Sequence, residues 1–193
     1  SASSAARWWL AKHRDLFRLD NVRSLTVLAD SKLTGSTGHA VTFQQSLGGL
    51  KVVNGSGMIT VTLRPAKTSR WKVGFVSSTA IGAAKLRGTV KLTAAQAFVH
   101  AASNAGFRSA SMLNVKGQKV ARGWINLRVG GLPDVQRLRL GSFAIGRTAV
   151  PAYETILLDR STADPAAFRV IVNARTGAVL ARTRLVDYFS TAK

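Results

Sequence analysis

Residues 38–63 constrain the fold more than any other segment, because they predict two strands joined by a tight turn. Alternating residues from Ala40 to Leu47 fall on the two faces of an extended strand, and one face carries Val41, Phe43, Gln45 and Leu47. The pair Gly48-Gly49 follows, and glycine reaches the positive φ that tight hairpin turns require. Glycines in the return segment predict a bulge or bend, so the pair reads as part of a twisted antiparallel sheet.

The rest of the first half adds a helix and further strands. Apolar residues at helical spacing predict a helix over residues 3–18, with Ser3 or Ser4 as its cap. A short strand is expected over residues 25–28, a loop over 30–38 and a third meander strand over 71–76.

The second half repeats the combination of one helix and several strands. Thr93 and Gln96 form a capping box, and an alanine-rich stripe then predicts a helix ended by Gly106. One hairpin is expected within residues 107–134. Later strands are expected over 135–143, 152–158, 168–172 and 178–186, the last two joined by a turn at 173–177. The chain is therefore predicted to be α+β, with two helix-on-antiparallel-sheet subdomains at residues 1–78 and 79–193.

Charge is the outlying feature of the composition. The 193 residues include 28 Lys and Arg against 8 Asp and Glu, a net charge of +20, and Glu154 is the only glutamate. Such a balance attracts anionic partners. Strand alternation puts Arg137 with Arg139, and Arg182 with Arg184, each pair on one face, so these four are candidates for contacting an anionic partner. They form either a common positive face or a set of separately solvated side chains.

Residues for bond-making chemistry are scarce. The three histidines are scattered with no adjoining glutamate, cysteine is absent, and the few acids occur singly, so we expect neither an enzyme nor a metal or cofactor site. Aromatic residues do not interleave with the basic ones, and we expect no sequence-specific nucleic-acid binding. No apolar run is long enough for a membrane-spanning helix.

Three segments resemble a known family. His39 and Phe43-Gln44-Gln45 with the following glycines, the helix ending in Leu16-Phe17, and the turn Asn173-Ala174-Arg175-Thr176-Gly177 resemble the propeptide region of fungalysin- and thermolysin-type secreted zinc metallopeptidases. That region has an FTP domain followed by a PepSY-like half. The matching stretches are residues 7–20, 38–63 and 150–187, and Asn173 replaces the usual aspartate of the turn.

The resemblance implies an FTP-like subdomain at 1–78, a PepSY- or cystatin-like subdomain at 79–193, and a secreted protein. It implies an intramolecular chaperone and inhibitor, with a zinc metallopeptidase domain as partner; the positive charge suggests that this domain is acidic. Residues implied at that interface are His39, Phe43, Gln44 and Gln45 in the hairpin and Tyr188 and Phe189 in the tail.

Simpler interpretations of the same residues remain open. The hairpin also fits a generic two-stranded ribbon, and His39 fits an edge histidine that bonds the backbone. The chain also fits a free-standing secreted basic module of the same fold that binds an anionic cell-envelope polymer or itself. A nucleic-acid-associated basic protein is a further alternative.

Overall fold

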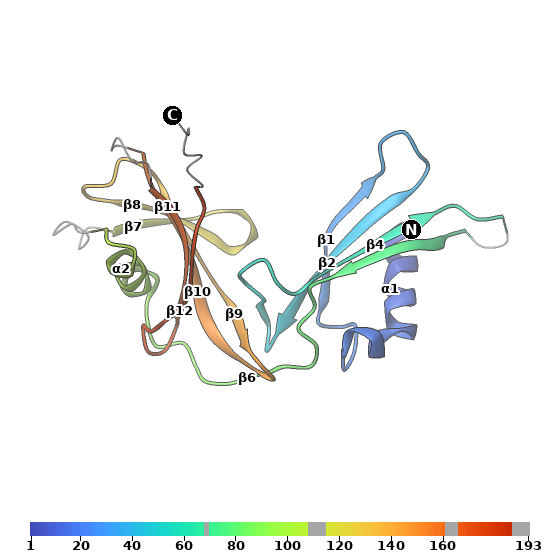
Figure 1. Ribbon diagram of the computed structural model, residues 1–193, viewed down its shortest axis with the longest axis horizontal. Helices are drawn as coiled ribbons and strands as arrows, with labels where there is room; N and C mark the ends of the chain where they lie inside the picture. Colours follow the sequence, from blue (N-terminus) through green and yellow to red (C-terminus); the bar gives the residue numbers. More distant parts are fainter. Residues whose placement is uncertain (68–69, 108–114, 161–165, 187–193) are drawn as a thin grey trace, which may run out of the picture. The chain divides into compact units, whose positions relative to one another are not determined.

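Two units, each made of one α-helix and a mainly antiparallel sheet, are seen in the computed structural model (Figure 1), which describes residues 1–67, 70–107, 115–160 and 166–186. Unit 1 comprises Ser1–Leu86 with Ala144–Ala149, and unit 2 comprises Arg87–Phe143 with Val150–Lys193. The predicted α+β class is confirmed by this arrangement of helices and sheets.

The helix of unit 1 is shorter than its sequence pattern predicts. Helix α1 spans Ala2–Lys12, and the Ser1 side chain, rather than Ser3 or Ser4, caps it by accepting the Ser4 amide. A 3₁₀ turn, η1 (Arg14–Phe17), follows and ends at Arg18, whose φ of 53° is left-handed. Leu16 is largely exposed instead of lying on the buried stripe, because the tighter turn rotates it away from the sheet.

The sheet of unit 1 has the strand order β1-β2-β4-β5, with the short β3 paired to β2. Gly48 and Gly49 both take positive φ and join β2 to β3 as predicted, but the main partner of β2 is the later strand β4. Strand β1 continues to Lys32, into the segment predicted as a loop, because it pairs with β2 along that length. Leu10 of α1 packs with Phe43 and Ile59 in a fully buried core. The strands are β1 (Leu25–Lys32), β2 (His39–Leu47), β3 (Leu50–Lys51), β4 (Met58–Arg64) and β5 (Lys72–Ser78).

A short parallel pairing sets the division between the units. Strand β6 (Lys85–Leu86) pairs with Thr148 and Ala149, at the tip of the hairpin between β9 and β10 (Figure 1). A small apolar cluster of Leu47, Val52 and Ala149 buries this tip within unit 1. The contacts therefore divide the chain after Leu86 and include residues 144–149 in unit 1, whereas the sequence placed the boundary after residue 78.

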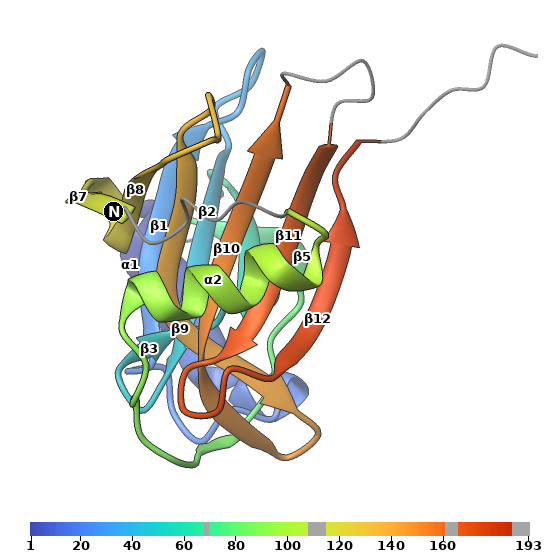
Figure 2. The ribbon, with the colours of Figure 1, turned by 90° about the vertical axis from the view of Figure 1, so that its left-hand side faces the viewer.

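Unit 2 places helix α2 (Ala94–Asn104) across one face of the sheet β12-β11-β10-β9-β8-β7 (Figure 2). Phe98 of the helix is fully buried with Leu138, Leu157 and Val170 of the sheet. The predicted capping box of Thr93 and Gln96 is present. The strands are β7 (Val115–Lys119), β8 (Trp124–Val129), β9 (Gln136–Ile145), β10 (Thr148–Asp159), β11 (Ala166–Asn173) and β12 (Val179–Arg184), with the 3₁₀ turn η3 (Ala121–Gly123) before β8.

The side chain of Asn173 closes the turn between β11 and β12. Asn173 Oδ1 accepts the amides of Arg175 and Thr176 at 2.8 and 3.2 Å. An aspartate at this position would accept the same two bonds.

Candidate binding surface

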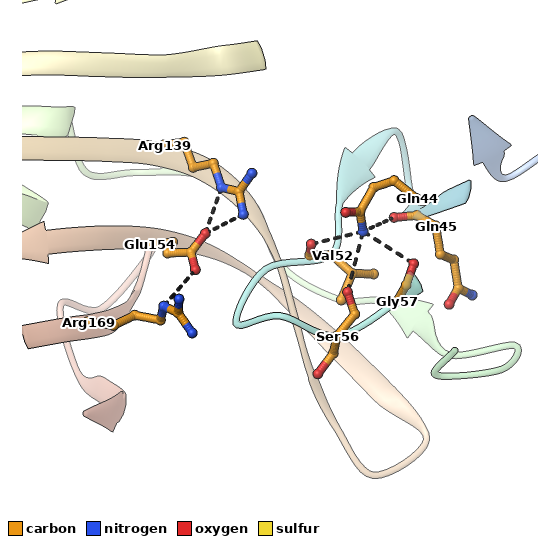
Figure 3. Close-up of polar contacts among 8 residues, drawn as sticks. All are labelled: Gln44, Gln45, Val52, Ser56, Gly57, Arg139, Glu154 and Arg169. Atoms are coloured by element: carbon orange, nitrogen blue, oxygen red, sulfur yellow. Dashed lines mark hydrogen bonds and ion pairs between the residues drawn. The ribbon is translucent and has the colours of Figure 1, made fainter. Parts of the chain in front are cut away.

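The sheet face of unit 2 opposite α2 carries an ion cluster around Glu154. Tyr153 and Leu157 point to the helix side, so alternation places Glu154 on the other face. Arg139 Nε donates to Glu154 Oε2 at 2.6 Å, and Arg169 Nε lies 3.3 Å from Oε1 (Figure 3). One buried carboxylate thus holds two guanidinium groups from two neighbouring strands.

An aromatic ring extends this cluster by one strand. Trp124 on β8 lies opposite Arg139 in the ladder, and the Arg139 Cζ is 4.5 Å from the centre of its ring. This distance is within the range of cation–π attraction. Across the four strands β8 to β11 the groups are an aromatic ring, two arginines and one carboxylate, with a net charge of +1. Arg128 and Arg137 on the same face add exposed positive charge.

The two predicted arginine pairs lie on opposite faces of the sheet. Arg137 and Arg139 alternate with the buried Leu138, which faces α2. Arg182 lies opposite Val170 on the α2 side, donates to the Asn104 carbonyl oxygen at 2.7 Å and stacks over Phe168. Arg184 lies opposite Phe168 on the same side. The four residues do not form one patch, because the sheet separates them.

His39 at the start of β2 contacts Asp30 of the neighbouring strand β1. His39 Nδ1 lies 3.0 Å from Asp30 Oδ1, and its ring packs edge-on against Trp71. No serine or threonine hydroxyl among the described residues bonds to this histidine. The side chain is about a third exposed, so His39 still presents part of its ring to solvent.

The other three hairpin residues proposed for the interface are buried. Phe43 is fully inaccessible and lies under the Arg7 guanidinium. Gln44 Nε2 lies 3.2–3.4 Å from four backbone carbonyl oxygens (Figure 3). Gln45 donates to the Gly82 carbonyl at 2.7 Å and accepts the Ile81 amide at 3.0 Å. These side chains hold unit 1 together, which corrects their prediction as a contact surface. Tyr188 and Phe189 lie outside the described residues.

Groups suited to metal binding or catalysis are sparse in the described segments. No cluster of three or more His, Asp or Glu side chains is found there. None of the helices in those segments is long and apolar enough to cross a membrane.

The ion pair between Asp134 and Arg160 in unit 2 lowers the pKa of Asp134. Arg160 donates from Nε and from its backbone amide to the Asp134 carboxylate, both at 2.9 Å. The side-chain hydrogen bond from Arg160 holds the pKa of Asp134 below its ordinary value of 3.8. Because the folded-state pKa is lowered, the pair contributes stability above pH 3.8, and that contribution disappears as the pH falls through the lowered pKa.

Replacing Arg160 with alanine is expected to raise the pKa of Asp134, because the largest cause of its lowering is removed. The measurement is the pH dependence of the Asp134 carboxyl carbon chemical shift. Arg175→Ala removes the same charge from the β11–β12 turn and serves as the control. A pKa of Asp134 that is the same in the wild type and in Arg160→Ala would contradict the assignment.

One signal in the sequence could have indicated the Glu154 cluster. A single glutamate stands in an apolar strand of a chain with 28 basic residues. A buried strand position and a lone acid together favour a shared ion pair. Which arginines reach it depends on strand register, and the partner Arg169 and the stacked Trp124 could not be chosen from spacing.

No protein-family model matches the chain, and no curated protein matches its sequence. Among solved structures, the Bacillus megaterium YpeB C-terminal domain aligns with 96% of this chain at a TM-score of 0.40 and 15% sequence identity. This chain spans 64% of the length of that structure. A likeness of this degree assigns neither a family nor a function.

Proposed function

We propose that this chain is a non-catalytic, propeptide-like binding module that assists the folding of a secreted zinc metallopeptidase and inhibits it. The observation that carries the binding role is the charge around Glu154, where one carboxylate is shared by two arginines beside the exposed Arg128 and Arg137. Unneutralised guanidinium groups on a sheet face favour a partner with an acidic surface. The choice of a zinc metallopeptidase as the partner rests on the hairpin and turn residues, which resemble those of such propeptides.

The mechanism needs no bond-making step. A module that binds the native-like state of the peptidase more tightly than the unfolded state stabilises that state by mass action. The same contacts inhibit when they cover the substrate cleft. Positive charge on the module raises the rate of encounter with an acidic partner.

The test adds the purified chain to the catalytic domain of an acidic thermolysin-type peptidase, during activity and during refolding. We expect inhibition at micromolar concentration and a higher refolding yield. Arg128→Glu/Arg137→Glu should slow association severalfold, because like charge repels the partner. The control Arg64→Glu/Arg70→Glu makes the same charge change at exposed positions of unit 1. Absence of inhibition at micromolar concentration, or equal slowing by both variants, would reject the proposal.

A second candidate is a free-standing module that binds an anionic cell-envelope polymer. The observation that favours it is the placement of Arg137/Arg139 and Arg182/Arg184 on opposite faces, because a flexible polymer can contact both. Binding to lipoteichoic acid and to single-stranded DNA is measured against salt concentration. A steep loss of affinity for both alike would mean charge contacts only. Tight binding to the envelope polymer alone, without inhibition of the peptidase, would favour this candidate.

A further inference from the structure

A basic cavity lies within unit 1, away from the Glu154 cluster. It has a volume of about 550 Å³ and is lined by three chain segments. These are the residue that ends η1, the segment before β6, and the tip of the β9–β10 hairpin, which the structure assigns to unit 1. The lining residues are Arg18, Ile81, Gly82, Ala83, Ala84, Gly146 and Arg147.

Hydrogen bonds hold the walls of this cavity in place. The buried Gln45 bonds to both Ile81 and Gly82, at 3.0 and 2.7 Å. The Lys85 amide donates to the Arg147 carbonyl oxygen and ties the hairpin tip to the start of β6. A Cβ on Gly82 would lie 3.1 Å from the Arg18 Cβ, and its φ of 76° is strained for a residue with a side chain, so both features favour glycine here. The cavity is therefore built by specific contacts rather than by an open loop.

Three of its residues adopt left-handed backbone conformations. The φ values are 53° at Arg18, 76° at Gly82 and 60° at Gly146. For a residue with a side chain this conformation is strained, and such strain clusters at ligand-binding positions. Arg18 adopts this conformation at the end of η1, where it also lines the cavity.

The charge of the cavity is uncompensated. Its lining holds two arginines and no acid, and neither arginine forms an ion pair with any described residue. The remaining lining is glycine, alanine and isoleucine, which adds no competing acceptor side chain. Two arginines that line the same cavity make it positive, and this charge favours an anion there.

We infer that this cavity binds a small, multiply charged oxyanion group, phosphate or polycarboxylate, through Arg18 and Arg147. Guanidinium groups bind both chemistries through paired, charge-assisted hydrogen bonds. Two arginines favour a ligand with at least two negative charges over a singly charged one. This site is independent of the proposed peptidase-binding role, because its lining residues belong to unit 1 alone.

The test titrates the full chain with sodium phosphate, with citrate and with acetate by calorimetry, at constant ionic strength. We expect saturable binding of phosphate or citrate with a Kd of about 1 mM and none of acetate. The two multivalent ligands separate phosphate from carboxylate recognition. Arg18→Ala/Arg147→Ala should weaken binding at least about tenfold, because two charge-assisted contacts are lost. Arg64→Ala/Arg70→Ala removes the same charge outside the cavity and should change the Kd less than about twofold.

A second variant tests the inference in case the Arg18→Ala/Arg147→Ala protein does not fold. Arg147→Lys keeps the charge at an exposed position but loses the planar fork, so binding should weaken severalfold while thermal unfolding is unchanged. Three results would overturn the inference. The first is no saturable heat with either multivalent anion, and the second is equal weakening by the cavity double variant and by the control double variant. The third is wild-type affinity both in the Arg147→Lys protein and in the Arg18→Ala/Arg147→Ala protein.

Discussion

Replacing Glu154 with glutamine is expected to lower the free energy of unfolding of unit 2 by about 3 kcal/mol. The carboxylate is only 2% exposed and is the shared partner of Arg139 and Arg169. Glutamine preserves the shape but removes the charge, so two partly buried guanidinium groups lose their counter-ion. The arginine side chains are 21% and 34% exposed, and water partly compensates them, which places the effect at the low end of the range for broken buried pairs.

The measurement is urea unfolding followed by ¹⁹F NMR of fluorotryptophan. Trp124 is the one tryptophan of unit 2, so its resonance reports that unit separately from the three tryptophans of unit 1. Asp15→Asn is the control, because the Asp15 side chain is 95% exposed and its contact with Arg14 is 3.8 Å. The control should change stability by less than about 0.5 kcal/mol. A loss of the same small size in Glu154→Gln would show that the cluster does not stabilise the sheet.

A second substitution tests whether the effect comes from the unpaired arginines. Combining Glu154→Gln with Arg139→Met removes one of the stranded charges and replaces it with an apolar chain of similar length. The double variant should lose about 1–3 kcal/mol less than the sum of the two single losses. Additive losses would mean that Glu154 acts through another contact.

Local patterns of the sequence predicted most of the elements of this fold. The alternation of residue character along the chain predicted β2, a capping box predicted the start of α2, and two glycines predicted the turn after β2. Each of these signals acts within a few residues of the chain, where propensity and hydrogen-bond geometry are strongest. The α+β class followed from the order of these elements.

Features that depend on distant contacts were not predictable in the same way. The pairing of β2 with β4 lies within the predicted return segment, but its register, with Phe43 opposite Ile59, does not follow from the turn because residues 52–57 separate β3 from β4. The parallel pairing of β6 with the tip of the β9–β10 hairpin joins residues about sixty positions apart, and two-residue strands carry no pattern of their own. The observed division between the units therefore lies after Leu86 rather than after residue 78, where the sequence predicted it.

The candidate site shows the same division between local and distant information. Strand alternation correctly placed Arg137 with Arg139 on one face. It did not show that the sheet separates them from Arg182, because this requires the register of the four strands from β9 to β12. The conspicuous Phe43-Gln44-Gln45 run suggested a contact surface by its resemblance to propeptides, whereas burial shows that these side chains serve the interior of unit 1.

Replacing Gln45 with alanine is expected to destabilise unit 1 by about 2–4 kcal/mol, because two buried backbone groups each lose a partner. Gln45 is 1% exposed, and its amide bonds both the Gly82 carbonyl and the Ile81 amide. Alanine leaves this donor and this acceptor without a replacement in the interior and opens a cavity beside them. The segment before β6 then loses its attachment to β2.

The Trp71 fluorine resonance reports this loss, since Trp71 packs at the edge of the unit 1 core. Gln118→Ala makes the same chemical change at an exposed position on β7 and should shift stability by less than about 0.5 kcal/mol. Gln45→Glu separates the two bonds: its carboxylate still accepts the Ile81 amide but, when ionised, cannot donate to the Gly82 carbonyl. It also places a charge in the interior, so its loss should equal or exceed that of alanine at neutral pH and diminish as the pH falls. A Gln45→Glu protein as stable as the wild type at neutral pH would show that the donor bond to the Gly82 carbonyl contributes nothing to the stability of unit 1.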